Sequence, residues 1–220
     1  MNPPTLDTVD IDTPRGLGRL HVAEADRPQA LLLLGHGAGG GVDAFDLAAL
    51  AAGLPADGVT VALFEQPWRV AGKRVAPAPK ALDEGWRAAL DATTARWGNL
   101  PLVVGGRSAG ARSACRCFAP PAVGALLLSF PLHPPGRPDR SRADELRAVT
   151  APTLLIHGSR DPFGSPEELR TTVAGRDNFS LVFVDGATHS FKPTRKADDP
   201  GARAGQIVDA AREFLRGLLS

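Results

Sequence analysis

"PLVVGGRSAGARSA", residues 101–114, decides the fold, because a short apolar run leads directly into several glycines around one serine. Residues 106–110 match the pattern G-x-S-x-G, with Ser108 at the centre. Where such a turn joins a strand to a helix, the serine backbone is strained and the residues two positions away must be small. The N-terminus of the following helix would direct free N–H groups toward a developing oxyanion. The stretch therefore predicts a nucleophilic serine, and a plain glycine turn is the alternative.

Apolar segments typical of strands alternate with amphipathic segments typical of helices along most of the chain. Continuous apolar strands favour a parallel sheet with helices on both faces. We expect strands at 9–11, 18–23, 29–37, 58–65, 101–105, 123–132, 152–158 and 179–186, and helices at 43–54, 80–97, 109–118, from about 166, and at 201–219. Residues 65–79 would be a long loop, and the link at 133–143 is too short for a large lid domain. The sequence predicts an α/β fold in a single domain, residues 1–220, with sites where the parallel strands end.

A serine hydroxyl is a poor nucleophile at neutral pH, so it needs a base such as histidine. His189 lies in "DGATHSF", a loop that follows the last predicted strand and precedes the final helix. His36 and His157 end strands just before a glycine, where we expect them to hold the turn, and His21 lies on the edge hairpin. We therefore predict that His189 is the base, and a solvated loop histidine is the alternative.

The base needs a carboxylate to orient it, and "HGSRDPFG" offers Asp161 shortly after a predicted strand. Asp185 is the rival, because it ends the following strand four residues before His189. We prefer Asp161 because it projects from a separate strand end. The chain order is then Ser108, Asp161, His189, the order found in α/β-hydrolases.

An oxyanion hole is expected from "LLLLGHGAGGG", residues 31–41, which ends the strand predicted to lie beside the nucleophile strand. The backbone N–H of Ala38, helped by Gly39, would be one donor, and the N–H of Ala109 the second. A glycine-rich loop of this kind can instead bind phosphate. However, it matches neither G-x-G-x-x-G opening a helix nor a Walker A loop with its Lys-Ser/Thr.

The conjunction of these motifs resembles the α/β-hydrolase superfamily over nearly the whole chain, and its length is similar to that of the compact dienelactone-hydrolase-like branch. More narrowly, "LLLGHGAGG", "FEQPWRVAGKRVAPAP", "GGRSAGAR", "FPLHPPGRP" and "HGSRDPFG" resemble small hydrolases related to a testis-expressed protein and to a subunit of a nonspecific-lethal histone acetyltransferase complex. The resemblance implies a mostly parallel eight-stranded sheet and a serine triad. Ser108 departs from the dienelactone hydrolases, whose nucleophile is cysteine.

Side chains from the loops at the same sheet edge are candidates for binding substrate. Trp68 offers an apolar wall, Arg69 could pair with an acidic group, and Arg107 is adjacent to the nucleophile. His133 leaves another strand at this edge. The alternatives are a solvated basic loop, a salt bridge from Arg107, and packing of His133 against prolines.

Composition limits the partners of the chain. The formal net charge is +1, which gives no reason to expect nucleic acid or an anionic membrane surface. The longest apolar runs are too short to span a bilayer. Cys115 and Cys117 lie two apart in a predicted helix, so their side chains point in different directions. We expect both to be reduced packing residues of a cytoplasmic protein.

These observations together predict a serine hydrolase that cleaves a small or accessible carboxylic ester or thioester. The reaction would need no metal and no organic cofactor, and the protein would be a monomer or a homodimer. Two alternatives stay open: a catalytically silent hydrolase fold that binds another protein, and an acyltransferase or amidase that uses the same triad.

Overall fold

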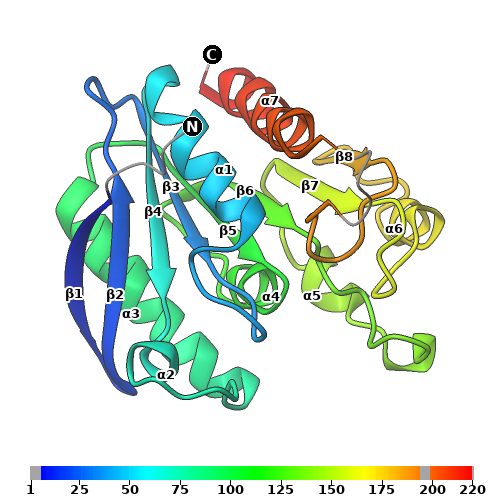
Figure 1. The fold of residues 1–220 in the computed structure, drawn as a ribbon, viewed down its shortest axis with the longest axis horizontal. Coiled ribbons are helices and arrows are strands. Elements are labelled where there is room, and N and C mark those ends of the chain that lie inside the picture. The colour runs from blue at the N-terminus through cyan, green and yellow to red at the C-terminus, as the bar shows by residue number, and fades with distance from the viewer. Residues whose placement is uncertain (1–5, 194–198, 220) are drawn as a thin grey trace.

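The computed structural model describes residues 6–193 and 199–219, and one eight-stranded sheet forms its centre (Figure 1). The strands are β1 (Asp7–Thr13), β2 (Gly16–Ala23), β3 (Ala30–Gly35), β4 (Val59–Glu65), β5 (Leu102–Arg107), β6 (Ala122–Leu128), β7 (Thr153–Gly158) and β8 (Phe179–Val184). Their order in the sheet is β1-β2-β4-β3-β5-β6-β7-β8. β2 is antiparallel to both of its neighbours, and all other neighbouring strands are parallel. The expected mostly parallel sheet is confirmed.

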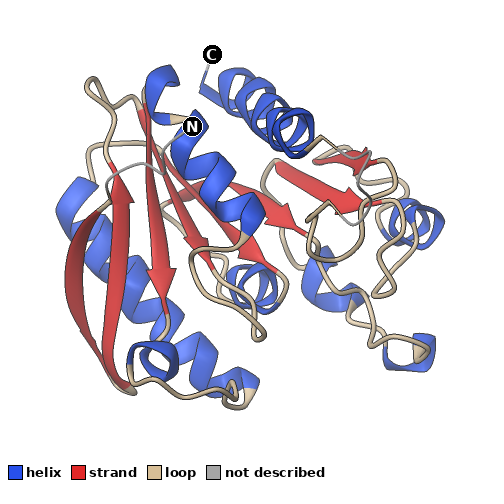
Figure 2. Ribbon diagram, in the orientation of Figure 1, coloured by secondary structure: helices blue, strands red, loops and turns tan. Residues whose placement is uncertain are grey.

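Helices cover both faces of the sheet (Figure 2). One face packs against α1 (Phe45–Gly53) and α7 (Pro200–Leu219). The other packs against α3 (Pro79–Trp97), α4 (Ala109–Arg116), α5 (Ala143–Arg147) and α6 (Pro166–Thr172). No helix within residues 6–193 and 199–219 is both long and apolar enough to cross a lipid bilayer.

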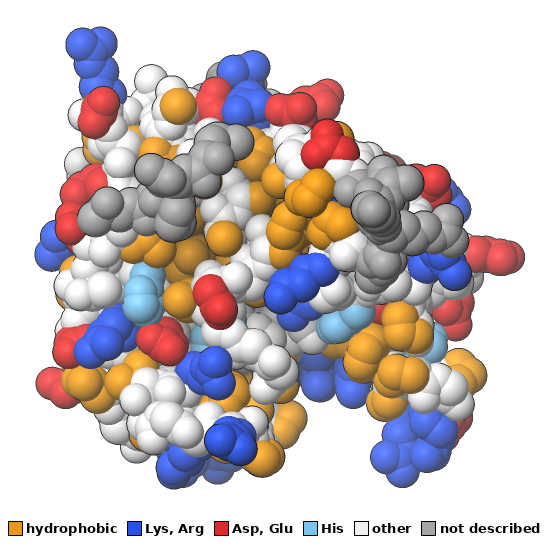
Figure 3. Space-filling model, viewed as in Figure 1, with side chains coloured by type: hydrophobic (Ala, Val, Ile, Leu, Met, Phe, Trp, Pro, Cys, Tyr) orange, Lys and Arg blue, Asp and Glu red, His pale blue; other side chains and the backbone are white. Residues whose placement is uncertain are grey.

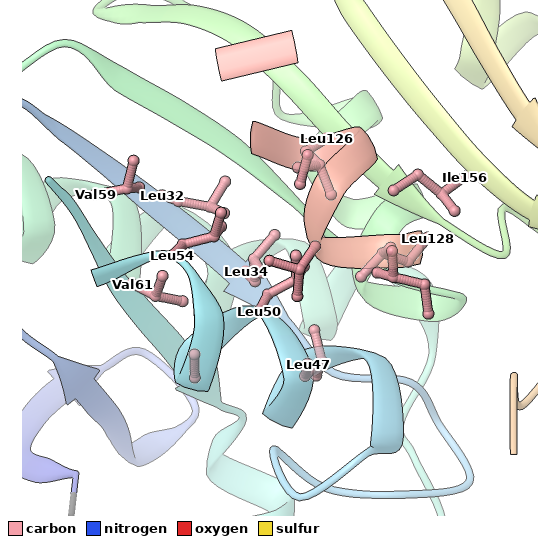
Figure 4. Packing of buried hydrophobic residues seen from close by; sticks show 14 of the residues in the cluster. Leu32, Leu34, Leu47, Leu50, Leu54, Val59, Val61, Leu126, Leu128 and Ile156 are labelled. Atoms are coloured by element: carbon pink, nitrogen blue, oxygen red, sulfur yellow. The ribbon is translucent and has the colours of Figure 1, made fainter. Parts of the chain in front are cut away.

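The leucines of β3 show why a continuous apolar run belongs in the middle of such a sheet. Successive side chains of a strand point to opposite faces. Leu32 and Leu34 therefore pack with Leu50 of α1 in one core, as Figure 4 shows. Leu31 and Leu33 pack with the α3 side in the other core. Each face is buried only because helices lie on both sides.

Two segments contain helices that the sequence prediction assigned to loops. Within 65–79 lies α2 (Pro67–Val70), and within 133–143 lie a 3-10 turn (Pro138–Arg140) and the start of α5. Both Pro67 and Pro138 occupy the first turn of their helix, where proline is tolerated because that N–H has no intrahelical partner. These helices are too short to show a hydrophobic period, so the prediction was wrong there.

Parallel strands bring their C-terminal ends to one edge, and the predicted site residues follow these ends. β3 ends just before the glycine loop at 37–41, and β5 pairs with it in parallel, with Gly106 opposite Gly35. The strand that carries the predicted oxyanion loop therefore does lie beside the nucleophile strand.

Candidate active site

Ser108 occupies the turn between β5 and α4 in a strained backbone conformation. Its φ is 54° and its ψ is −112°, a backbone conformation that residues other than glycine rarely adopt. The turn is fixed on both sides. The N–H of Ser108 donates to the carbonyl of Leu128 at 3.0 Å, and the N–H of Arg112 donates to the carbonyl of Ser108 at 3.1 Å. Such strain persists only where the surroundings enforce it, and it clusters at functional sites.

The glycines two residues before and after Ser108 are required by the neighbouring strand. A Cβ atom on Gly106 would lie 2.5 Å from the carbonyl oxygen of Gly35, and one on Gly110 would lie 2.3 Å from the same oxygen. Gly106 also has a φ of +152°. Any larger residue at either position would push β3 away from the turn, so G-x-S-x-G is a steric requirement of this site.

The side chains of Ser108, His189 and Asp161 form one continuous chain of contacts. His189 Nε2 lies 2.9 Å from Ser108 Oγ, and His189 Nδ1 lies 2.8 Å from Asp161 Oδ2. The Asp161 side chain is inaccessible to solvent, whereas the His189 side chain keeps 20% of its exposure. The structure thus brings together three residues that are far apart in the sequence.

Asp161 is held by the turn that follows β7. Its Oδ1 accepts the N–H of Phe163 at 2.9 Å, which leaves Oδ2 directed at His189. The rival carboxylate, Asp185, is exposed and accepts the hydroxyl of Ser159 at 3.2 Å. Of the two candidates, only Asp161 contacts the histidine within the described residues.

Phe163 is part of this site, although the sequence did not predict it there. Its ring stacks on His189, with ring centroids 4.2 Å apart and an interplanar angle of 32°. The only sequence signal is its place in "DPFG", two residues after Asp161. The ring restricts rotation of the imidazole and supplies an apolar wall beside Ser108.

His36 and His157 hold turns, as predicted from their position before glycines. His36 Nδ1–H donates to the carbonyl of Gly37 at 2.8 Å, and His36 Nε2 accepts the N–H of Gln66 at 3.1 Å. Burial lowers the pKa of His36 and of His157. Both imidazoles are therefore kept neutral, and both ring nitrogens of His36 are occupied.

Backbone groups of Ala38, Gly39 and Ala109 line the same cavity as Ser108. The glycine loop approaches the serine closely, since a Cβ on Gly37 would lie 3.4 Å from Ser108 Cβ. In the part of the chain that the structure describes, neither the N–H of Ala38 nor that of Ala109 donates to a protein acceptor. Both groups are therefore free to donate to a ligand in the cavity.

Arg107 forms a buried salt bridge, the alternative to a direct role in substrate binding. Its Nε lies 3.2 Å from Asp46 Oδ2, and its Nη2 donates to the carbonyl of His189 at 2.8 Å. Asp46 is fully buried, and this burial raises its pKa to about 6 against the opposing charge of Arg107. Arg107 borders the cavity but is already committed to Asp46 and to the loop that carries His189.

The other predicted substrate-binding side chains lie outside this cavity. Trp68 is buried against His36, with ring centroids 5.6 Å apart, because α2 turns it inward. Arg69 is exposed and lines a separate hollow beside the glycine loop. His133 is buried next to Glu168, at 3.2 Å, and its Nδ1 lies 2.9 Å from the carbonyl of Pro134. The structure therefore corrects the expectation that these three residues would line the Ser108 cavity.

The comparison of the sequence with models of known families agrees with this geometry. Residues 28–216 match a family described as "Alpha/beta hydrolase domain". The chain belongs to the alpha/beta hydrolase family. The match covers the strand ends that carry Ser108, Asp161 and His189.

Among curated proteins, the chain is 28% identical over 180 residues to a Mycobacterium tuberculosis (strain H37Rv) protein whose name assigns it provisionally to the phosphoribosyl transferases. A protein of M. tuberculosis strain CDC 1551 matches in the same way. The alignment covers 78% of this chain and 39% of either relative, so the chain spans well under half of their length.

Solved structures of lid-free and esterase-type α/β hydrolases share the fold. Est1E from Butyrivibrio proteoclasticus has a TM-score of 0.74 at 15% identity and covers 95% of this chain and 99% of its own. An α/β serine hydrolase "without lid" from Xanthomonas campestris has a TM-score of 0.72 at 18% identity, over 97% of each chain. A serine hydrolase homologue from Coxiella burnetii has a TM-score of 0.73 at 15% identity, over 96% of each. At these identities the likeness concerns the fold alone.

Proposed function

We propose that this hydrolase cleaves a small or accessible carboxylic ester or thioester through an acyl-enzyme on Ser108. The observation that carries the proposal is the pair of contacts at His189, 2.9 Å to Ser108 Oγ and 2.8 Å to Asp161 Oδ2. This is the geometry of a nucleophile, its general base and the carboxylate that orients the base. The strained turn at Ser108 supports the same assignment.

In the first half of the reaction, Ser108 Oγ attacks the acyl carbon while His189 Nε2 takes the hydroxyl proton. Asp161 keeps the second proton of the imidazole on Nδ1 and stabilises the imidazolium that forms. The N–H groups of Ala38, Gly39 and Ala109 would bind the oxyanion of the tetrahedral intermediate. His189 then gives its proton to the leaving alcohol or thiol, and the acyl group stays on Ser108.

In the second half, water attacks the acyl-enzyme, and His189 again acts first as base and then as acid. Neither half uses a metal ion or an organic cofactor. Arg107 contributes indirectly, because its bond to the carbonyl of His189 fixes the loop that presents the imidazole. It is a positioning residue in this scheme.

Acyl transfer to an alcohol and hydrolysis of an amide would use the same residues, and product analysis with an added acceptor separates them from ester hydrolysis. A silent scaffold that only binds a protein partner is disfavoured by the unbroken contacts among Ser108, His189 and Asp161. The relation to the dienelactone-hydrolase-like branch, a cytoplasmic location, and a monomeric or homodimeric state stay predictions.

The test is covalent labelling of the purified chain with a fluorophosphonate, followed by mass spectrometry of the labelled peptide. We expect modification at Ser108, its loss in Ser108→Ala, and a fall of about 10⁶-fold in rate in His189→Ala, as for removal of a triad base. Folded wild-type protein that resists labelling would overturn the proposal and favour the silent scaffold.

A further inference from the structure

The cavity that contains Ser108 is positively charged by its own lining. It has a volume of about 450 Å³, and besides Ser108 and His189 its lining includes Arg107, Arg112 and Arg142. Among the residues that the structure describes, no aspartate or glutamate lines it. In the surface view, Lys or Arg atoms lie at the head of a notch in the lower outline of the molecule, just below exposed histidine atoms (Figure 3). A reaction site with several arginines and no carboxylate in its wall favours an anionic substrate.

Two of the three arginines are already neutralised by carboxylates behind the wall. Arg107 is paired with the buried Asp46 at 3.2 Å. Arg112 makes two bonds to the Glu145 carboxylate, at 2.8 and 2.5 Å, and Arg116 adds a third at 3.1 Å. These pairs fix the shape of the cavity and leave little charge for a ligand.

Arg142 differs from both. Its Nη1 donates to the carbonyl of Pro131 at 3.0 Å, and no carboxylate lies within 4 Å of its guanidinium among the described residues. The side chain is half-buried, and both burial and the charge of Arg112 lower its pKa. The Pro131 bond holds the guanidinium at the cavity wall instead of letting it extend into solvent. Among the described residues, Arg142 is thus an oriented cation without a direct ion pair, and Glu145 acts on it only from a greater distance.

We infer that the substrate of this hydrolase carries a carboxylate or phosphate group that binds Arg142 in the cavity that contains Ser108. A guanidinium with free N–H groups matches either anion with two parallel hydrogen bonds. Phe163 and Pro131 supply apolar parts of the wall of the same cavity. The inference rests on the proposed hydrolase function and specifies its substrate class.

A set of three fluorophosphonates tests the inference without knowledge of the natural substrate. They share one alkyl chain and end in a carboxylate, a phosphate monoester or a neutral amide. Because hydrogen bonds to charged groups are about twice as strong as those between neutral groups, we expect an anionic probe to label Ser108 of wild type at least about tenfold faster than the amide. The faster of the two anionic probes identifies which anion the site prefers.

The variants assign this preference to one residue. Arg142→Ala should lower the ratio of anionic to neutral labelling to near one. Arg142→Lys should restore part of the ratio, because an ammonium keeps the charge without the planar fork. Arg27→Ala makes the same charge change at an exposed position before β3, at the opposite edge of the sheet, and should keep the wild-type ratio.

The outcomes separate the two proposals. Equal labelling by all three probes, or a ratio that persists in Arg142→Ala, overturns the anionic substrate and leaves the serine hydrolase intact. Failure of every probe to label folded wild type overturns both. A ratio that falls equally in Arg27→Ala would mean that general charge, and not Arg142, attracts the anion, and would also overturn the inference.

Discussion

Arg107 and Arg142 line the same cavity, yet their surroundings give them opposite tasks. Arg107 lies in a buried pair with Asp46 and bonds to the backbone of the His189 loop. Arg142 is half-buried, its guanidinium is held by the carbonyl of Pro131, and no carboxylate lies within 4 Å of it among the described residues. An arginine whose charge is satisfied inside the protein holds structure, whereas one that is oriented but unsatisfied is available to a ligand.

The difference follows from where the carboxylates lie. Asp46 is in the first turn of α1, fully buried behind the cavity, so its charge is tolerable only with Arg107 beside it. On the other side, α5 presents Glu145 to Arg112 and Arg116, and this one carboxylate is shared by two guanidinium groups. Arg116 also pairs with Asp83 at 2.6 Å, so Arg142, three residues before Glu145, is left as the excess positive charge of that cluster.

The largest expected effect comes from breaking the buried pair. Arg107→Ala leaves the Asp46 carboxylate buried without a cation and should lower the free energy of unfolding at pH 7 by about 3–5 kcal/mol. Arg142→Ala loses one hydrogen bond to a carbonyl and should cost only about 1 kcal/mol. Urea unfolding followed by tryptophan fluorescence measures both values.

The pH dependence of the stability loss in Arg107→Ala is a control for this comparison of the two arginines. In Arg107→Ala, protonation neutralises the buried Asp46 carboxylate that has lost its cation. The loss of stability should therefore be smaller at pH 5 than at pH 7. Equal losses in the two alanine variants would contradict the distinction between a structural and a ligand-binding arginine.

The next largest effect is the pH dependence of the free energy of unfolding that Asp46 causes. Burial raises the pKa of Asp46 from 3.8 to about 6, so the folded protein binds a proton at this site more tightly than the unfolded chain does. Where the folded state holds more protons, stability falls as the pH rises. The wild type should therefore lose up to about 3 kcal/mol relative to Asp46→Asn between pH 4 and pH 6, and little more above that.

Unfolding curves of both proteins across this range give the difference directly, because other titrating groups cancel. Asp26→Asn removes an exposed aspartate in the turn before β3 and serves as the matched control. A wild-type protein that gains stability over Asp46→Asn as the pH rises would reverse the sign and refute the assignment.

The sequence was sufficient to predict those parts of the site that depend on local pattern. Ser108 was identifiable because glycines flank it in a turn, and His189 and Asp161 because each follows a separate strand end. Parallel pairing then brings such residues to one edge of the sheet without further information. The helix at 80–97 was also predictable, since its apolar residues recur at helical spacing and are buried.

The partners of the arginines could not be predicted in this way. Asp46 and Arg107 lie in different elements, as do Arg112 and Glu145, and nothing local marks either pair. For the same reason, the sequence did not predict the position of Trp68, which was expected to form an apolar wall of the substrate cavity. The short helix after Gln66 turns its ring toward His36, and a helix of this length leaves no period in the sequence.

The smallest expected effect comes from a substitution that would leave Arg112 without a paired carboxylate, as Arg142 is. Glu145→Gln keeps the shape of the side chain but removes the charge that neutralises Arg112, while Arg116 keeps its ion pair with Asp83. The ratio of carboxylate-probe to amide-probe labelling at Ser108 should then rise by about two- to fivefold at low salt, the scale of a partly exposed ion pair, and the gain should shrink at high ionic strength.

Asp144→Asn is the matched control for this last change, because it removes the same charge one residue earlier on α5. Asp144 is fully exposed, and its nearest cation is Arg147 at 3.8 Å. Solvent screens such a charge, so the labelling ratio should stay at its wild-type value. An equal rise in both variants would assign the preference to the general charge of α5. A rise confined to Glu145→Gln would instead show that anion selectivity depends on how many of the cavity's arginines lack a carboxylate.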